Sequence, residues 1–134
     1  MLEIEPIKVL LIDDDEDDAL IAQALLSDIS GGQYIFDWCA TYEDGLQEMM
    51  TNQHHVHLLD NSLGRSTGLE LFQEALEKGC HIPAILLTGT LQPEIHQRAR
   101  EAGFFSYQVK GQLDSRELAR LIQQAIDHHP MVVG

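Results

Sequence analysis

Basic residues are scarce in this sequence. Eight lysines and arginines stand against 22 aspartates and glutamates, which gives a formal net charge of −14. A negative field of this size repels phosphate backbones and anionic lipid headgroups unless a local basic patch intervenes. We therefore expect neither direct binding to nucleic acid nor attachment to a membrane surface.

Cysteines and long apolar runs are also few. Cys39 and Cys80 are isolated in the sequence and do not form the dense framework that crosslinks small secreted domains. No apolar run approaches the roughly 18 residues that a membrane-spanning helix needs. The N-terminal segment, residues 1–6, is acidic and lacks the basic start and apolar middle of a signal peptide. We expect a cytoplasmic protein with two reduced, structural thiols.

The length and composition indicate one folded domain. The chain has 134 residues, of which 44% are hydrophobic and 22% are charged, close to the averages for globular proteins. It contains no internal repeat, low-complexity stretch or linker. We expect a single domain over residues 1–134, with its core at about 7–129 and a loose tail at 130–134.

Short apolar segments alternate with helical patterns along the chain. Three segments have the continuous apolar character of strands that are buried on both faces: Val9–Ile12, Val56–Leu59 and Ala84–Leu87. Two mixed segments, Tyr34–Trp38 and Phe105–Val109, are typical of edge strands. The sequence therefore predicts five strands.

Helical spacing fills the gaps between these strands. In the last gap, Leu118, Leu121, Ile122 and Ala125 repeat at helical intervals behind a capping-box-like start at Asp114. Four further helices are predicted from apolar positions: Ile21, Ala24 and Leu25; Leu46, Met49 and Met50 after Thr41; Leu69, Phe72 and Leu76 after Thr67; and Ile95, Ala99 and Ala102 after Pro93. Five alternations with short crossovers predict a doubly wound α/β fold, a parallel sheet with helices on both faces.

Acidic residues directly follow two of the predicted central strands. Asp13 and Asp14 follow the first strand, and Asp60 follows the third. In the flavodoxin-like strand order 2-1-3-4-5 these strands are neighbours, so the three carboxylates meet in the crevice where such sheets bind ligands. Carboxylates held this close raise one another's pKa unless a hard cation with oxygen ligands neutralises them. The pattern favours a Mg²⁺ site.

Two further polar side chains end neighbouring strands. Thr88 closes the fourth apolar segment and Lys110 closes the fifth. A hydroxyl and an ammonium group at the edge that carries the acids are suited to bind the oxygens of an anion.

Four segments of the chain resemble the receiver domain of two-component response regulators. They are LLIDDDEDD at the first strand end, HLLDNSLGRSTGLELF around Asp60, IPAILLTG before Thr88, and SYQVKG around Lys110. The resemblance extends from Lys8 to His128. It implies that Asp60 accepts a phosphoryl group from a sensor histidine kinase or a histidine phosphotransfer protein. It also implies a signalling domain, not an enzyme, that catalyses only its own phosphorylation and dephosphorylation.

The resemblance assigns roles to the other residues of the site. Asp14, Asp60 and the backbone carbonyl of Ser62 would bind Mg²⁺ directly, Asp13 would act largely through water, and Lys110 would pair with the phosphoryl oxygens. Thr88 and Tyr107 would move inward on phosphorylation. Their movement would remodel the face of the fourth helix, fifth strand and fifth helix, to which a downstream protein partner would bind.

The sequence departs from the family pattern at two glycines. Gly111 stands where the family usually has a proline with a preceding cis peptide bond, and Gly64 stands where proline is also frequent. Neither change removes a reacting group, and glycine adopts most backbone conformations.

Other interpretations of the acids and histidines were weighed. The acidic run Asp15–Asp18 is explained by a helix N-terminus, where the helix dipole favours negative charge. The histidines at positions 54, 55, 57, 128 and 129 invite a transition-metal site, but no carboxylate or cysteine completes a familiar ligand spacing.

Two other functions remain as alternatives. A receiver-like binding module that does not respond to phosphate would share the fold. Haloacid-dehalogenase-type phosphatases place a nucleophilic aspartate after the first strand, and Asp13, Asp15, Thr88 and Lys110 superficially fit that pattern. That family needs a further acidic pair near a later strand end, whereas only Asp114 lies close after Lys110, and Asp60 would have no role.

Overall fold

The structure, a computed structural model, describes residues 5–29 and 33–128, and these form an α/β fold around one parallel sheet. The five strands are β1 (Ile7–Ile12), β2 (Tyr34–Cys39), β3 (Val56–Asp60), β4 (Ala84–Thr88) and β5 (Ser106–Val109). Their order is β2-β1-β3-β4-β5, and every neighbouring pair is parallel. The predicted doubly wound, flavodoxin-like topology is confirmed.

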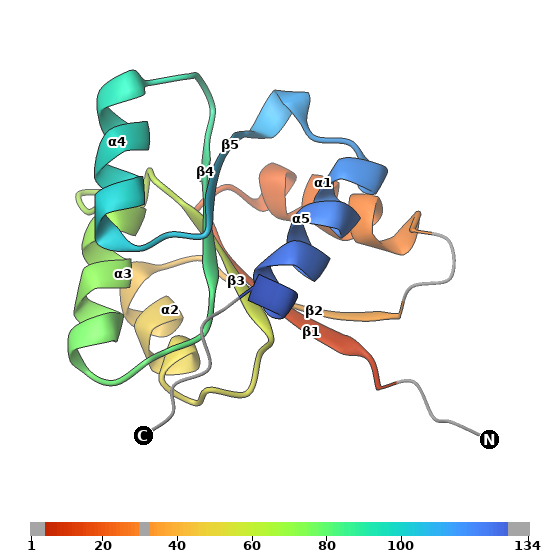
Figure 1. The fold of residues 1–134 in the computed structure, drawn as a ribbon, viewed down its shortest axis with the longest axis horizontal. Coiled ribbons are helices and arrows are strands. Elements are labelled where there is room, and N and C mark those ends of the chain that lie inside the picture. Colours follow the sequence, from red (N-terminus) through yellow and green to blue (C-terminus); the bar gives the residue numbers. More distant parts are fainter. Residues whose placement is uncertain (1–4, 30–32, 129–134) are drawn as a thin grey trace.

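Five helices cover the two faces of this sheet. They are α1 (Glu16–Ser27), α2 (Tyr42–Met49), α3 (Gly68–Glu77), α4 (Pro93–Ala102) and α5 (Ser115–His128). Figure 1 shows α2, α3 and α4 on one side of the sheet and α1 and α5 on the other. Each side has its own hydrophobic cluster, so the sheet is buried between two apolar layers.

The central strands supply alternate residues to these two layers. In β1, Leu10 and Ile12 belong to the cluster under α2, α3 and α4, while Val9 and Leu11 belong to the cluster under α1 and α5. All positions of β3 and β4 are buried, as expected of parallel strands covered on both faces. The outer strands β2 and β5 are partly exposed, which confirms their prediction as edges.

The predicted helix starts are confirmed by their capping contacts. The hydroxyl oxygens of Thr41 and Thr67 accept hydrogen bonds from the backbone N–H groups of Asp44 and Glu70, and Pro93 is the first residue of α4. These contacts satisfy backbone donors that lack partners in the first turn of a helix.

The start of α5 follows the predicted pattern in one half only. The Asp114 carboxylate accepts a hydrogen bond of 2.8 Å from the backbone N–H of Glu117. The Glu117 carboxylate pairs with Arg120 in the next turn. A reciprocal capping box is therefore not formed, because the arginine provides a charged partner for that carboxylate.

Several predicted strand ends need correction. Strand β1 begins two residues before Val9, and β5 begins one residue after Phe105. Lys110 does not close β5 but begins a 3-10 turn (Lys110–Gln112), since β4 ends at Thr88, the pairing partner of Val109. Once strand pairing stops, the chain is free to turn, and the turn directs the lysine side chain toward the end of the sheet.

Two predictions reach the limits of the description. The predicted tail at 130–134 and His129 lie outside the described residues. Within the described part of the chain, no helix is long and apolar enough to cross a membrane. Cys39 is half-buried, Cys80 is buried, and both are free thiols.

Candidate metal centre

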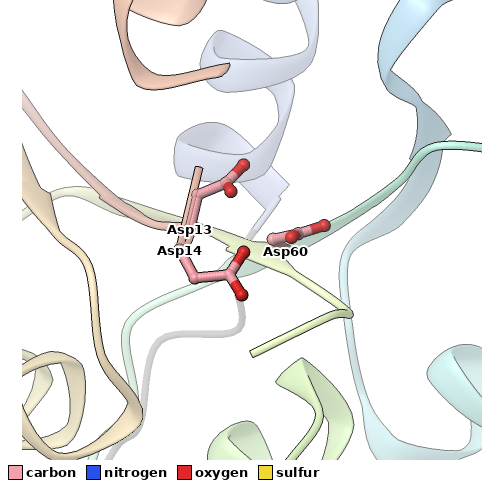
Figure 2. Close-up of side chains that lie close together, drawn as sticks. All are labelled: Asp13, Asp14 and Asp60. Atoms are coloured by element: carbon pink, nitrogen blue, oxygen red, sulfur yellow. The ribbon is translucent and has the colours of Figure 1, made fainter. Parts of the chain in front are cut away.

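Three carboxyl groups meet at the carboxyl edge of the sheet. Strands β1 and β3 are neighbours with Ile12 opposite Leu59, so the residues that follow lie side by side. Asp13, Asp14 and Asp60 each offer a carboxylate oxygen, and these oxygens lie within 4.8 Å of one another (Figure 2). Asp13 and Asp60 are buried and Asp14 is exposed. The three acids that the sequence predicted as metal ligands therefore form one cluster.

Local hydrogen bonds orient two of these acids. The Asp13 carboxylate accepts a bond of 2.9 Å from the backbone N–H of Asp15, and the Asp13 carbonyl accepts a bond of 2.7 Å from the indole N–H of Trp38. The Asp14 carboxylate accepts a bond of 3.3 Å from the backbone N–H of Gly64. The loop after β3 thus holds an acid that follows β1.

The ammonium group of Lys110 contacts three carboxylates. Its Nζ lies 2.8 Å from Asp13, 3.1 Å from Asp60 and 2.6 Å from Asp18. The lysine therefore reaches the cluster from beyond β5 and contributes a positive charge at its border. The contact with Asp18, in the first turn of α1, was not predicted from the sequence.

The acids at this edge are held against their ordinary ionisation. Burial, with the neighbouring Asp13 charge, raises the pKa of Asp60 to about 6, although Lys110 acts in the opposite direction. Burial also raises the pKa of Asp13. For Lys110, burial lowers the pKa, but its hydrogen bonds to Asp13 and Asp18 and the Asp60 charge raise it further, so the lysine stays charged.

The donor set fits a hard divalent cation. Four carboxylates, the three of the cluster and that of Asp18, meet one ammonium group, so the site retains excess negative charge. Grouped carboxylate oxygens are the ligands that Mg²⁺ and Ca²⁺ prefer. A cation among them would favour the ionised form of Asp60 by removing the repulsion from Asp13.

An open cleft lies beside Asp60. It has a volume of about 350 Å³ and is lined by Asp60, Ser62, Gly64, Thr88 and Gly89, among others. The buried Thr88 hydroxyl donates a hydrogen bond of 2.9 Å to the carbonyl of Thr90. The predicted hydroxyl therefore lies at the same edge as the acids, with room for a small anion between them.

Tyr107 lies between β5 and α4. Its ring stacks on His96, with ring centroids 4.8 Å apart, and its hydroxyl accepts a hydrogen bond of 2.9 Å from the backbone N–H of Gln92. The side chain is largely buried. It is connected to the loop that follows Thr88, and it does not contact the carboxylates.

The two glycines that depart from the family pattern differ in their requirements. Gly64 has φ +66°, a left-handed conformation that proline cannot adopt, and its N–H is needed by Asp14. The Lys110–Gly111 peptide is trans, and a methyl group on Gly111 would contact nothing within 4 Å. The backbone thus requires a glycine at position 64 but not at position 111.

Three contributions to the site were missed from the sequence. Asp18 was interpreted only as a helix-dipole acid, Trp38 only as part of an edge strand, and Gly68 was assigned no role. A Cβ atom on Gly68 would lie 2.5 Å from the Asp60 carbonyl oxygen, so α3 can approach this strand end only without a side chain there. The position of a glycine at the start of a helix after Asp60 was the one available signal.

Comparisons with known proteins agree on one family. The sequence model described as response regulator receiver domain matches residues 9–129. Among curated proteins, the chain is 29% identical over 114 residues to the transcriptional regulatory protein DltR of Streptococcus agalactiae, covering 85% of this chain and 50% of DltR. It is 28% identical over 119 residues to the response regulator RppA of Synechocystis, covering 85% of this chain and 48% of RppA. The chain thus spans about half the length of these relatives.

Solved structures show the same fold. The signal receiver domain of a modulated diguanylate cyclase from Desulfovibrio desulfuricans is 25% identical with a TM-score of 0.76, covering 92% of this chain and 95% of that one. The chemotaxis protein CheY4 of Vibrio cholerae is 21% identical with a TM-score of 0.75, covering 90% of this chain and 99% of that one. Since the family model matches nearly the whole chain, the protein belongs to the response regulator receiver domains of two-component signalling.

Proposed function

We propose that Asp60 accepts a phosphoryl group from a phosphohistidine on a sensor histidine kinase or a histidine phosphotransfer protein. The observation that carries this proposal is the grouping of Asp13, Asp14 and Asp60 within 4.8 Å, with the Lys110 ammonium 3.1 Å from Asp60. Asp60 is the acid that both borders the open cleft and contacts the lysine. It can therefore meet an incoming phosphate while its own charge is balanced.

The reaction is a transfer between two nucleophiles. A carboxylate oxygen of Asp60 forms a bond to phosphorus, the bond between phosphorus and the donor's histidine nitrogen breaks, and its electron pair stays on that nitrogen. Asp14, Asp60 and the Ser62 carbonyl hold Mg²⁺, with Asp13 acting largely through water. The cation neutralises the charge that develops on the phosphoryl oxygens.

Lys110 and Thr88 recognise the transferred group. The lysine already faces Asp60 at 3.1 Å, so it can pair with a phosphoryl oxygen placed on that carboxylate. The Thr88 hydroxyl exchanges its bond to the Thr90 carbonyl for one to the phosphoryl group. The added group has about −1.5 to −2 charges and three acceptor oxygens, which supports both contacts.

Tyr107 transmits the change to a protein surface. Its hydroxyl already contacts the loop after β4, which includes Gln92, so a movement of that loop alters its hydrogen bonds. The ring lies between β5 and α4, next to His96. We assign the downstream protein partner to the face formed by α4, β5 and α5.

The phosphatase alternative is not favoured by the position of Asp15. That alternative uses Asp13 as nucleophile and an acid two residues later. The Asp15 carboxylate caps α1 by accepting a hydrogen bond of 2.9 Å from the Asp17 N–H, and Asp15 is exposed. Asp13 is held by Lys110 and lies away from the residues that line the cleft.

The proposal extends to the whole sequence given. Residues 1–134 act as one receiver domain in the cytoplasm, without direct contact to nucleic acid or membrane. The net charge of −14 supports this assignment, because it disfavours polyanionic partners.

Intact-mass measurement tests the proposal. The wild-type protein and an Asp60→Asn variant are incubated with acetyl phosphate, with and without Mg²⁺. We expect the wild type to gain one phosphoryl group only when Mg²⁺ is present, and the variant to gain none. Equal uptake by the variant would refute the assignment of Asp60, and a folded wild type that gains no phosphoryl group would favour the phosphate-independent module.

A further inference from the structure

The environment of Lys110 contains one acid that is not part of the metal cluster. Two of its three carboxylate contacts, those to Asp13 and Asp60, use side chains that also offer oxygens to the cation. The third, to Asp18, is the shortest at 2.6 Å. Asp18 does not belong to the group of acids whose oxygens lie within 4.8 Å of one another. It therefore contacts the lysine without competing for the metal.

A cation and the ammonium group use the same oxygens. An ammonium group has three N–H donors, and in this structure three carboxylates surround it. When a cation binds Asp13 and Asp60, those oxygens become less available to Lys110. The lysine then loses two partners but can keep the third, because Asp18 projects from α1 at the border of the cluster and is half-buried.

We propose that Asp18 is a positioning residue that holds the Lys110 ammonium at the border of the metal cluster. This inference rests on the proposed function, since it assigns Asp18 a part in preparing Lys110 for the phosphoryl group. By giving the lysine a partner outside the cluster, Asp18 lowers the cost of releasing Asp13 and Asp60 to the cation. It also keeps the ammonium close to Asp60, where a phosphoryl oxygen will arrive.

An Asp18→Asn variant tests this role through cation affinity. The amide cannot form an ion pair, so Lys110 depends more on Asp13 and Asp60, and Mg²⁺ must displace it from both. We expect the Mg²⁺ dissociation constant from calorimetry to rise about fivefold, the upper range for one partly exposed ion pair. The melting temperature without Mg²⁺ should change little, and Asp18→Glu should restore part of the affinity.

Asp17→Asn is the matched control. Asp17 lies one residue earlier in the same first turn of α1, is exposed, and is not among the acids that contact Lys110. The variant removes the same charge at nearly the same place on the helix. If both variants weaken Mg²⁺ binding equally, the effect is a general loss of negative charge and the inference is wrong.

A double-mutant cycle shows whether Asp18 acts through Lys110. In a Lys110→Met background there is no ammonium to position, so Asp18→Asn should weaken Mg²⁺ binding no more than Asp17→Asn does. An undiminished fivefold effect in that background would overturn the inference.

The outcomes separate this inference from the proposed function. A wild type that takes up the phosphoryl group while Asp18→Asn and Asp17→Asn bind Mg²⁺ alike leaves the function intact and refutes the role of Asp18. A Lys110-dependent effect of Asp18 on Mg²⁺ affinity, in a protein that takes up no phosphoryl group, supports the positioning role and refutes the phosphoacceptor function.

Discussion

His57 and Asp60 lie three residues apart on β3, and both are buried titratable groups with opposite surroundings. Neither ring nitrogen of His57 has a hydrogen-bond partner, and its nearest aromatic neighbour is His54, at a centroid distance of 6.0 Å. His54 itself pairs with Asp37 at 2.8 Å. Asp60, by contrast, contacts Lys110 and lies beside two further acids. One strand thus passes from an apolar interior to a charged edge.

Burial acts on both groups by favouring their neutral forms. Burial, with a smaller contribution from His54, lowers the pKa of His57 to about 3, so this side chain is neutral at pH 7. Burial raises the pKa of Asp60 to about 6, so this side chain is mostly ionised at pH 7 despite its surroundings. The interior of the strand therefore avoids charge, whereas its carboxyl end keeps charge at a cost in stability. Such a cost is typical of functional sites.

Replacement of His57 should produce the largest gain in stability. His57→Leu removes two unpaired buried nitrogens, which is worth about 1 kcal/mol. The folded protein resists protonation of His57 while the unfolded chain accepts it below its ordinary pKa of 6.5, so wild-type stability falls as pH falls from 6.5 toward 3. This adds about 2 kcal/mol to the advantage of the variant at pH 5. Urea denaturation at pH 7 and pH 5 measures both effects.

A His57→Leu variant with no greater advantage at pH 5 than at pH 7 would contradict this assignment. It would mean that His57 is protonated as easily in the folded protein as in the unfolded chain.

Replacement of Asp60 should reveal the opposite dependence on pH. Because the pKa of Asp60 is raised from 3.8 to about 6 on folding, the folded state binds more protons than the unfolded chain between these values. The contribution of Asp60 to stability therefore worsens as pH rises from about 4 to 6 and stays unfavourable above 6. In the presence of a chelator, we expect Asp60→Asn to be about 1–3 kcal/mol more stable than the wild type at pH 7.

That gain should shrink toward pH 4 and on addition of Mg²⁺ to the wild type. Thermal unfolding from pH 4 to pH 7 measures it. A constant difference over this range would show that Asp60 ionises in the folded protein as it does in the unfolded chain.

Two glycines at the charged edge should differ in their tolerance of a methyl group. Gly68→Ala would place a Cβ atom 2.5 Å from the Asp60 carbonyl oxygen, and the required shift should cost about 1–3 kcal/mol. Gly111→Ala meets nothing within 4 Å and should change stability by less than about 0.5 kcal/mol. Chemical denaturation of the two variants under one condition compares them. Equal effects would show that α3 does not pack as closely against Asp60 as the structure indicates.

The sequence predicts features that depend on local patterns. The three buried strands, the caps at Thr41 and Thr67 and the acids after β1 and β3 follow from hydrophobic periodicity and from residue types at element ends. The resemblance to receiver domains then placed Lys110 and Thr88 at the same edge as the acids.

Features that depend on tertiary orientation were not predictable in this way. Asp18 and Lys110 are 92 residues apart, and their contact depends on which side of α1 faces the 3-10 turn. The same is true of Trp38, whose indole reaches the carbonyl of Asp13 from the neighbouring strand. No spacing in the sequence encodes these contacts, because each requires two separate segments to be in place first.

The most direct test of the account is to identify which carboxylate carries the phosphoryl group. The protein is treated with acetyl phosphate and Mg²⁺ and then with borohydride, which reduces an aspartyl phosphate to homoserine, and its peptides are sequenced by mass spectrometry. The account predicts homoserine at position 60, with Asp13 and Asp14 unchanged. Homoserine at position 13, or at neither position in a protein that binds Mg²⁺, would contradict it.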